Sequence, residues 1–474
     1  MSTVAPGTRT GFRAGAGFLP DPTFYASPRR AAQAPPETLA YVAIIQPKQD
    51  RPDAIGVVDT NPRSDRYGQV VGRVELPYSG DELHHFGWNA CSSALCPAAP
   101  HPHVRRRYLI VPGIRSSRLY IIDTEAPTEP KVVKVIEPEE LMERTGYSRP
   151  HTVHCGPDAI YVSALGAPDG GGPGGIFLLD HDTFEPLGPW EIDRGPQNLA
   201  YDFFWHIGWD IMVTSEWGTP NQVENGLQLD QLVGNQYGRA IHIWDLRRRR
   251  HLKRLEVGEG DQMVLELRPA HDPRKRYGFV DVVISTKDLS ASIWLWYHDG
   301  SDWAIRKVIE IPAEPAAEDD LPPALKAFKA VPPLVSDIDL SIDDRFLYVS
   351  CWGTGELRQY DVSNPFEPKL TGSVHLGGIV RRAPHPRSGP LTGGPQMLEV
   401  SRDGRRVYVT NSLYLPWDAQ FYPDGIRGWL AKLDSDPSGG VTADPEFFAD
   451  FGEERTHQVR LQGGDASSDS YCFP

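Results

Sequence analysis

The chain has 474 residues, of which 40% are hydrophobic, and its formal net charge is −15 at pH 7. This acidic balance argues against a nucleic-acid partner, which would require a basic face. No apolar run reaches the ~18 residues that a membrane-spanning helix needs, so no membrane insertion is expected. Residues 1–30 contain no apolar signal region, and a cytoplasmic location is therefore expected.

The N-terminal residues 1–38 are rich in Gly, Ala, Pro and Arg and contain few aliphatic side chains. This composition favours a loosely ordered extension on the surface. We expect a single domain over residues 39–474, although length alone would favour about three domains of roughly 150 residues each. The reason is a repeat that runs from residue 39 towards the C-terminus.

The repeating unit is rich in β-branched and aromatic residues, which favour strands. Its most regular part is an apolar strand that ends in Asp and is followed, after a short loop, by another β-prone run. Six segments fit this description: residues 55–59, 119–123, 176–180, 241–245, 357–361 and 430–434. A seventh segment, residues 292–296, fits the gap between the fourth and the fifth but lacks the Asp.

Seven units of about four strands, roughly 50–70 residues apart, predict an all-β fold, a seven-bladed β-propeller. The strands expected at residues 39–45, 55–59 and 70–74 have no innermost partner before them, and residues 457–461 can supply it. Pairing of N- and C-terminal strands would close the ring and remove free edges. Residues 313–333, which we interpret as a surface loop, blur the register and leave six or eight blades as alternatives.

Five histidines fall where innermost strands are expected to begin: His84, His85, His151, His154 and His457. Innermost strands line the central channel of a propeller, and the last blade lies beside the first, so these imidazoles are expected to converge. Imidazole ligands suit copper, iron, zinc or nickel, and a set with few carboxylates favours a redox-active metal. For each single histidine, the alternative is a hydrogen-bonding role in the core.

The sequence contains an odd and sparse set of cysteines: Cys91, Cys96, Cys155, Cys351 and Cys472. With no CxxC pair, this set predicts neither a disulfide framework nor a structural zinc site, and it fits a reducing compartment. Cys91 follows His85 by six residues, and a thiol near a metal or a protonated imidazole becomes nucleophilic. Cys91 is thus the candidate catalytic residue, and a small buried hydrophobic side chain is the alternative.

Taken together, several segments resemble the selenium-binding protein family, whose characterised members include methanethiol oxidases. The resembling stretches are D-E-L-H-H-x-G-W-N-x-C-S-S at residues 81–93, H-T-x-H-C at 151–155, S-E-W at 215–217, L-R-Q-Y-D at 357–361, G-G-P-Q-M at 393–397, W-D-x-Q-F-Y-P at 417–423 and G-G-D at 463–465. The resemblance covers nearly the whole chain.

The resemblance implies a seven-bladed propeller that oxidises methanethiol with O2 and water to formaldehyde, hydrogen sulfide and hydrogen peroxide. In bacterial members it implies a copper site made of histidines. By motif, the ligands in this sequence would be His84, His85, one or both of His151 and His154, and His457. Some members carry further cysteines where this chain has Gly68, Ala94 and Ala466, so selenium attachment through those thiols is not expected here.

Two other functions are weighed against the oxidase. One is a non-catalytic propeller that binds selenium or sulfur. The other is a hydrolase of the lactonase type with calcium in the channel, which would need acidic and amide ligands such as Asp337 and Asn198. The histidine cluster would be a poor calcium site. The sequence makes no prediction of the oligomeric state.

Overall fold

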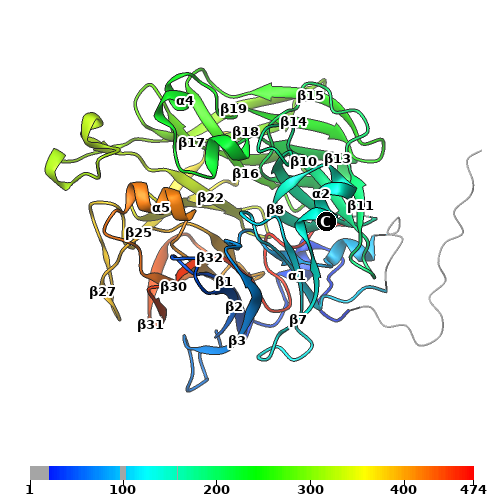
Figure 1. Ribbon diagram of the computed structural model, residues 1–474, viewed down its shortest axis with the longest axis horizontal. Helices are drawn as coiled ribbons and strands as arrows, with labels where there is room; N and C mark the ends of the chain where they lie inside the picture. The colour runs from blue at the N-terminus through cyan, green and yellow to red at the C-terminus, as the bar shows by residue number, and fades with distance from the viewer. Residues whose placement is uncertain (1–20, 97–102, 157) are drawn as a thin grey trace, which may run out of the picture.

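The computed structural model describes residues 21–96, 103–156 and 158–474. Seven four-stranded sheets form a seven-bladed β-propeller, which confirms the predicted fold and blade count (Figure 1). The first blade contains β1 (Leu39–Ile45), β2 (Pro52–Asp59), β3 (Val70–Ser79) and β32 (Arg455–Leu461). The second contains β4 (Gly87–Trp88), β5 (Tyr108–Pro112), β6 (Leu119–Asp123) and β7 (Lys131–Ile136).

The other five blades follow the chain without crossovers. The third contains β8 (Ser148–Cys155), β9 (Ile160–Gly166), β10 (Gly175–Leu179) and β11 (Pro186–Pro189), and the fourth β12 (Phe203–His206), β13 (Ile211–Ser215), β14 (Ala240–Asp245) and β15 (Arg250–Glu256). The fifth contains β16 (Asp261–Pro269), β17 (Tyr277–Ser285), β18 (Ala291–His298) and β19 (Trp303–Ile311). The sixth contains β22 (Val335–Leu340), β23 (Phe346–Cys351), β24 (Glu356–Asp361) and β25 (Lys369–His375), and the seventh β28 (Leu398–Val400), β29 (Arg406–Val409), β30 (Gly428–Ser435) and β31 (Val441–Gly452).

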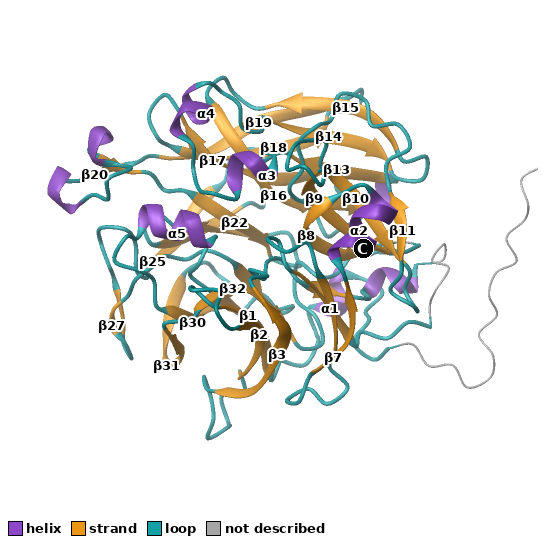
Figure 2. Cartoon of the chain, in the orientation of Figure 1, coloured by secondary structure: helices purple, strands orange, loops and turns teal. Residues whose placement is uncertain are grey.

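The α-helices are short; the first precedes β1, and the other four lie in connections between strands (Figure 2). They are α1 (Pro28–Ala31), α2 (Pro138–Thr145), α3 (Pro220–Val223), α4 (Leu229–Val233) and α5 (Leu415–Phe421). Two short hairpins, β20 (Glu314–Pro315) with β21 (Ala330–Val331) and β26 (Pro384–His385) with β27 (Gly389–Pro390), extend from the sheets. Among the described residues, no helix combines the length and the apolar character needed to cross a membrane.

The strand pattern found in the sequence corresponds to one place in every blade. All seven predicted segments form the third strand from the propeller axis. The terminal Asp closes the turn towards the outer strand, because its side chain accepts a hydrogen bond from a backbone N–H two residues later. Asp59, Asp123 and Asp361 each do so at 2.9 Å. This local turn explains why Asp recurs at the end of the strand.

The ring closes as predicted, because the last strand of the chain pairs with the first (Figure 1). β32 is antiparallel to β1, with Leu461 opposite Ala40 and Val459 opposite Val42. It supplies the innermost strand that the first blade lacks, so no sheet edge is left open at the seam. Each pair of neighbouring blades encloses one of seven hydrophobic clusters, so the core is divided around the ring.

Two segments outside the seven blades are more ordered than the sequence suggests. Residues 21–38 of the predicted loose extension pack on the propeller, where Phe24 and Ala31 are buried and Glu37 pairs with Arg406. Residues 1–20 lie outside the described part. The segment interpreted as a surface loop, residues 313–333, buries Leu321 in a hydrophobic cluster with Trp352. In both cases a few apolar side chains within a mainly polar or Pro-rich segment pack against the folded propeller, and these contacts cannot be read from composition.

Truncation of a buried side chain at the seam tests the closure. Leu461 is fully buried between the first and seventh blades. We expect Leu461→Ala to lower the free energy of unfolding by about 2–5 kcal/mol, because it removes buried methyl groups and leaves a cavity. Leu370→Ala, at a position 54% exposed on β25, is the matched control and should change it by less than about 0.5 kcal/mol. Urea denaturation measures both, and equal effects would contradict the closure.

Candidate metal centre

Four of the five predicted histidine ligands lie together where the inner strands of neighbouring blades begin. His84 and His85 precede β4, while His151 lies in β8. The His84 ring centroid is 4.5 Å from that of His151 and 3.8 Å from that of His457, which lies in β32. The centroids of His85 and His151 are 4.2 Å apart, and all four side chains are buried. The repeat thus brings residues from both ends of the chain to one point.

Two residues before His84, and two before His151, the backbone takes a left-handed turn. Glu82 has a φ of 52° and Arg149 one of 56°, a region that costs a non-glycine residue roughly 1–2 kcal/mol. Specific contacts hold both turns. The Glu82 carboxylate accepts the backbone N–H of Leu415 at 2.5 Å, and the Arg149 N–H donates to a serine hydroxyl at 2.9 Å. The turns therefore fix the direction in which the imidazoles enter the site.

The acidic pair of the D-E-L-H-H motif anchors the loop that carries the two histidines. Asp81 accepts a hydrogen bond from the Tyr120 hydroxyl at 2.6 Å and pairs with Arg118 at 3.2 Å. Glu82 pairs with Arg115 at 3.0 Å. Burial raises the pKa of Glu82 to about 7, and the Arg115 charge opposes this rise. These carboxylates are structural, since both bind neighbouring protein groups.

The hydrogen bonds of His457 determine which nitrogen of His84 carries a proton. His457 Nδ1 lies 2.8 Å from the carbonyl oxygen of Ser412, which can only accept, so Nδ1 is the donor. His457 Nε2 is therefore the acceptor towards His84 Nδ1, 3.1 Å away. His84 then carries its proton on Nδ1 and has a lone pair on Nε2. In this arrangement His457 orients His84 and presents no free nitrogen of its own.

His85 and His151 share a second orienting group, the hydroxyl of Thr152. Thr152 Oγ1 lies 2.9 Å from His151 Nδ1 and 3.4 Å from His85 Nδ1. Glu266 Oε1 also lies 3.6 Å from His85 Nδ1. Partners on the Nδ1 side leave the Nε2 side of each ring for another ligand, as is usual for metal-binding histidines.

The donor atoms that remain fit a transition metal. The buried Nε2 atoms of His84, His85 and His151 have no hydrogen-bond partner in the described part of the chain. Potential ligand nitrogens of the three rings lie within 4.8 Å of one another. Buried polar atoms are normally satisfied, so three orphaned nitrogens at one point require an explanation. Three imidazoles suit copper, zinc, iron or nickel.

The site also keeps its histidines neutral, which metal binding requires. Burial lowers the pKa of His84, His85 and His151 well below the usual value, and the neighbouring imidazoles lower it further. Burial lowers the pKa of His457 to about 4, partly offset by its hydrogen bond to Ser412. Protons therefore compete with a metal only at acidic pH.

His154, the fifth predicted ligand, is not placed with the others. Its ring packs against Phe203 and Phe204, with centroids 5.3 and 4.5 Å away, and its Nε2 lies 4.0 Å from Asp202. A register shift in β8 between Pro150 and Val153 separates the two histidines of this strand. The sequence could not decide between them, because a bulge changes which side chains face the axis.

The structure corrects the interpretation of the cysteines. Cys91 and Cys155 form a disulfide with a Cα–Cα distance of 6.1 Å, and Cys96 and Cys472 form another at 5.7 Å. Cys351 is free and buried. The prediction of no disulfide framework is therefore wrong. Sequence separations of 64 and 376 residues gave no spacing signal, because Cys91 and Cys155 come from neighbouring blades and Cys472 comes from near the C-terminus.

Cys91 was predicted to be a nucleophile, but in the disulfide it has no thiolate to offer. Both sulfur-bearing side chains are buried, at 2% and 4% exposure for Cys91 and Cys155. Ser93 Oγ lies 2.9 Å from Cys91 Sγ. Any chemistry at Cys91 would first require reduction of this bond.

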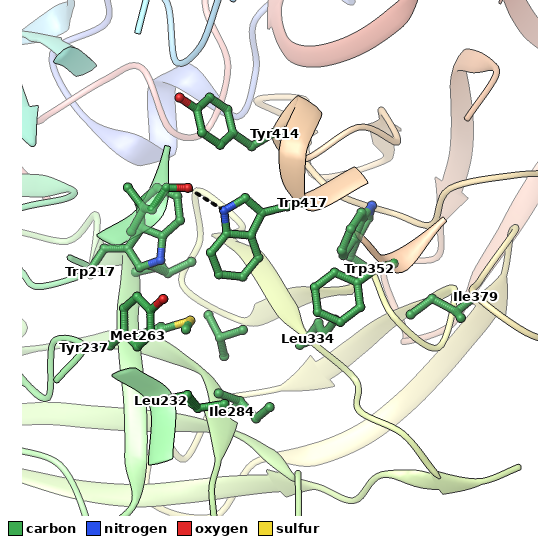
Figure 3. Close-up of a cluster of buried hydrophobic side chains, with 14 of the residues drawn as sticks. Trp217, Leu232, Tyr237, Met263, Ile284, Leu334, Trp352, Ile379, Tyr414 and Trp417 are labelled. Atoms are coloured by element: carbon green, nitrogen blue, oxygen red, sulfur yellow. Dashed lines mark hydrogen bonds between the residues drawn. The ribbon is translucent and has the colours of Figure 1, made fainter. Parts of the chain in front are cut away.

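Beside His84 lies an apolar cavity that was not predicted. Its volume is about 20 Å³, and Trp217, Met263, Leu334 and Trp417 line it together with His84. Trp217 and Trp417 are drawn in Figure 3. Their ring centroids are 5.7 Å apart. The Trp417 indole N–H donates to the carbonyl of a residue in α3 at 2.9 Å. The motifs at residues 215–217 and 417–423 contain the two tryptophans, and their role could have been inferred only from the fold.

Further along the inner strands, buried charges replace the histidines. The Arg268 guanidinium lies 3.2 Å from both Glu266 and Asp337, 3.4 Å from Asp339 and 3.6 Å from Asp202. Burial raises the pKa of all four carboxyls, and Arg268 opposes this rise. This network accounts for Asp337, one of the two residues considered for a calcium-dependent hydrolase. The other, Asn198, lines a separate pocket with Glu216 and Arg239.

The chain matches one protein family over almost its whole length. The family model described as 56kDa selenium binding protein (SBP56) matches residues 18–472. The chain belongs to the selenium-binding protein family. Within the family it is 39% identical to the methanethiol oxidase of Rattus norvegicus, with 94% of this chain and 97% of that protein covered. It is 38% identical to selenium-binding protein 2 of Mus musculus over the same shares.

Solved structures agree with this family assignment. The X-ray structure of a hypothetical selenium-binding protein from Sulfolobus tokodaii is 63% identical, has a TM-score of 0.94, and covers 96% of this chain and 100% of that one. A periplasmic gluconolactonase from Pseudomonas aeruginosa has a TM-score of 0.55 at 13% identity, covering 89% of this chain and 98% of that one. The latter likeness shows the propeller fold alone.

The two disulfides determine how many free thiols this protein should expose when it is unfolded. Without a reductant, denatured protein should take up one alkyl group from iodoacetamide, at Cys351, because the other four cysteines are bonded. After reduction it should take up five. Mass spectrometry measures both values. Uptake of three or five groups without reductant would contradict one or both disulfides.

The lowered pKa of His457 predicts a pH dependence of stability. A histidine whose pKa is about 4 when folded and about 6.5 when unfolded binds protons better in the unfolded chain. Its contribution therefore destabilises the fold as the pH falls from about 6.5 towards 4. Metal-free wild-type protein should lose more unfolding free energy between about pH 7 and 4.5 than His457→Gln does. Urea denaturation across this range measures the difference, and parallel pH profiles would contradict it.

Proposed function

We propose that this protein is a copper-dependent thiol oxidase of the methanethiol oxidase type. The reaction is methanethiol with O2 and water to formaldehyde, hydrogen sulfide and hydrogen peroxide. One observation carries the proposal: three orphaned imidazole nitrogens converge beside a small apolar cavity, in a family whose relatives include methanethiol oxidases.

The protein groups have separate tasks in this proposal. His84, His85 and His151 would hold the metal through Nε2, while the His457 and Thr152 contacts on the Nδ1 side fix the ring orientations. When bound, copper supplies a soft centre that favours a thiolate sulfur and exchanges electrons. We assign no step to Cys91 while it is bonded to Cys155.

The surroundings favour a small, uncharged thiol. The cavity wall beside His84 is apolar, and its volume of about 20 Å³ is near the minimum that holds one water molecule. The indoles of Trp217 and Trp417 line it and pack against each other in the surrounding apolar cluster (Figure 3). Such a site accepts a methyl group more readily than a charged substituent, because its mainly apolar wall offers little to replace lost hydration.

The alternative is a non-catalytic protein that binds selenium or sulfur, which the name of the mouse relative supports. In that case the histidines would still form a buried cluster but would not turn over a thiol. A cytoplasmic location remains a prediction. The two disulfides weigh against a reducing compartment, since such bonds are rare there outside hyperthermophiles.

Metal content and turnover test the proposal together. We expect about one copper per chain in protein produced with copper, because three neutral imidazoles converge. His84→Ala should lose it, and Thr152→Val should bind it about 10–100-fold more weakly because the rings lose an orienting partner. His298→Ala, on β18 away from the site, is the control. Elemental analysis measures the metal, and hydrogen sulfide release from methanethiol measures turnover.

The outcomes separate the two functions. Copper that is retained by the control and lost by His84→Ala, together with hydrogen sulfide release, would establish the oxidase. Protein that holds copper but releases no hydrogen sulfide would refute the reaction. Properly folded protein that binds no transition metal would refute the copper site and leave the binding protein as the function.

A further inference from the structure

Two residues that line the cavity with His84 have a backbone conformation that long side chains rarely adopt. Met263 has a φ of 63° and Leu334 one of 48°. Both are buried and line the cavity with His84. Left-handed backbone at a residue other than glycine is costly and persists only where the surroundings enforce it, so such outliers cluster at functional sites.

The left-handed turns at Met263 and Leu334 are of the same kind as those that position the histidines. Glu82 and Arg149 are left-handed two residues before His84 and His151. By the same spacing, Met263 and Leu334 precede Leu265 and Ser336, which also line the cavity. The same backbone turn thus precedes metal-ligand candidates at two positions and residues of the mainly apolar cavity wall at two others.

Met263 is fixed in place by its own strand and by the neighbouring blade. Its backbone N–H donates to the carbonyl of Gly238 at 2.8 Å. The adjacent Gln262 side chain donates to the carbonyl of Leu232 at 2.8 Å. The β16–β17 pairing shifts register just beyond, between Val264 and Leu267. The side chain therefore cannot leave the cavity by a simple change of strand register.

We propose that Met263 determines substrate specificity by filling the space that a longer alkyl chain would occupy. This inference rests on the proposed thiol oxidation and names its substrate class, thiols with a single carbon. The thioether is apolar and adaptable, and the remaining volume of about 20 Å³ beside His84 leaves no room for additional methylene groups. Met263 acts on the alkyl group and takes no part in bond making or breaking.

The first test compares methanethiol with 1-propanethiol, which has two more methylene groups. One methylene in a closed apolar pocket changes kcat/KM by about 10–200-fold. Wild-type protein should therefore prefer methanethiol at least ~100-fold, and Met263→Ala should reduce this ratio at least ~10-fold. Met263→Leu keeps the volume without the sulfur and should retain the preference. An unchanged ratio in Met263→Ala would overturn the proposal.

Glycine provides a second variant should the alanine variant fold poorly. Glycine accommodates a φ of 63° without strain, so Met263→Gly removes the side chain and relieves the backbone. It should show the same relaxed preference as Met263→Ala. Retained preference for methanethiol in a folded Met263→Gly protein would overturn the assignment.

A binding measurement separates this inference from the oxidase proposal. Dimethyl sulfide contains the same three heavy atoms, carbon, sulfur and carbon, that Met263→Ala removes, and it does not reduce disulfides. Calorimetry on metal-free protein should detect its binding to Met263→Ala and none to wild type or Met263→Leu. Binding of dimethyl sulfide to Met263→Ala can be detected even if no variant oxidises methanethiol. No binding to folded Met263→Ala, or equal binding to wild type, would refute the space-filling role.

Discussion

The pairing of β32 with β1 is the contact on which the rest of this molecule depends. It completes the first blade, removes the open edge of the ring and sets seven hydrophobic clusters between seven blades. It also carries His457 from near the C-terminus to within 3.1 Å of His84. Because the seam and the site use the same strand, the geometry of the site depends on the closure of the whole propeller.

Desolvation gives the site its chemical character. Burial keeps the histidines neutral, and the fixed acceptor at Ser412 O imposes one tautomer on His457 and, through it, on His84. The result is a lone pair on His84 Nε2 that has no hydrogen-bond partner among the described residues. An orphaned acceptor is unfavourable in the absence of a ligand. A metal at this point would satisfy it and return part of that free energy to the folded state.

The same left-handed backbone turn occurs at four positions around the site and serves two purposes. Left-handed turns at Glu82 and Arg149 direct histidines inward, whereas those at Met263 and Leu334 belong to the apolar wall. Farther along the inner strands, Arg268 gathers carboxylates of two inner strands, β16 and β22, and of Asp202, just before β12, into one buried network. Corresponding positions on the inner strands thus form metal-ligand candidates, an apolar cavity wall or a buried charge network, depending on the side chain that each blade carries there.

The sequence by itself predicted a ring of seven blades, with six or eight as alternatives, and it predicted the ring closure and the family. The Asp-ended strands recur because an Asx turn is a local interaction, and the histidines share a register because each begins an innermost strand.

Only the tertiary structure decided that His151 and not His154 joins the cluster, since the bulge in β8 leaves no sequence signal. It alone paired Cys91 with Cys155 and Cys96 with Cys472 across 64 and 376 residues. It also assembled the cavity from Trp217, Met263 and Trp417. Local turns are encoded by neighbouring residues, whereas contacts between blades exist only after the ring has closed.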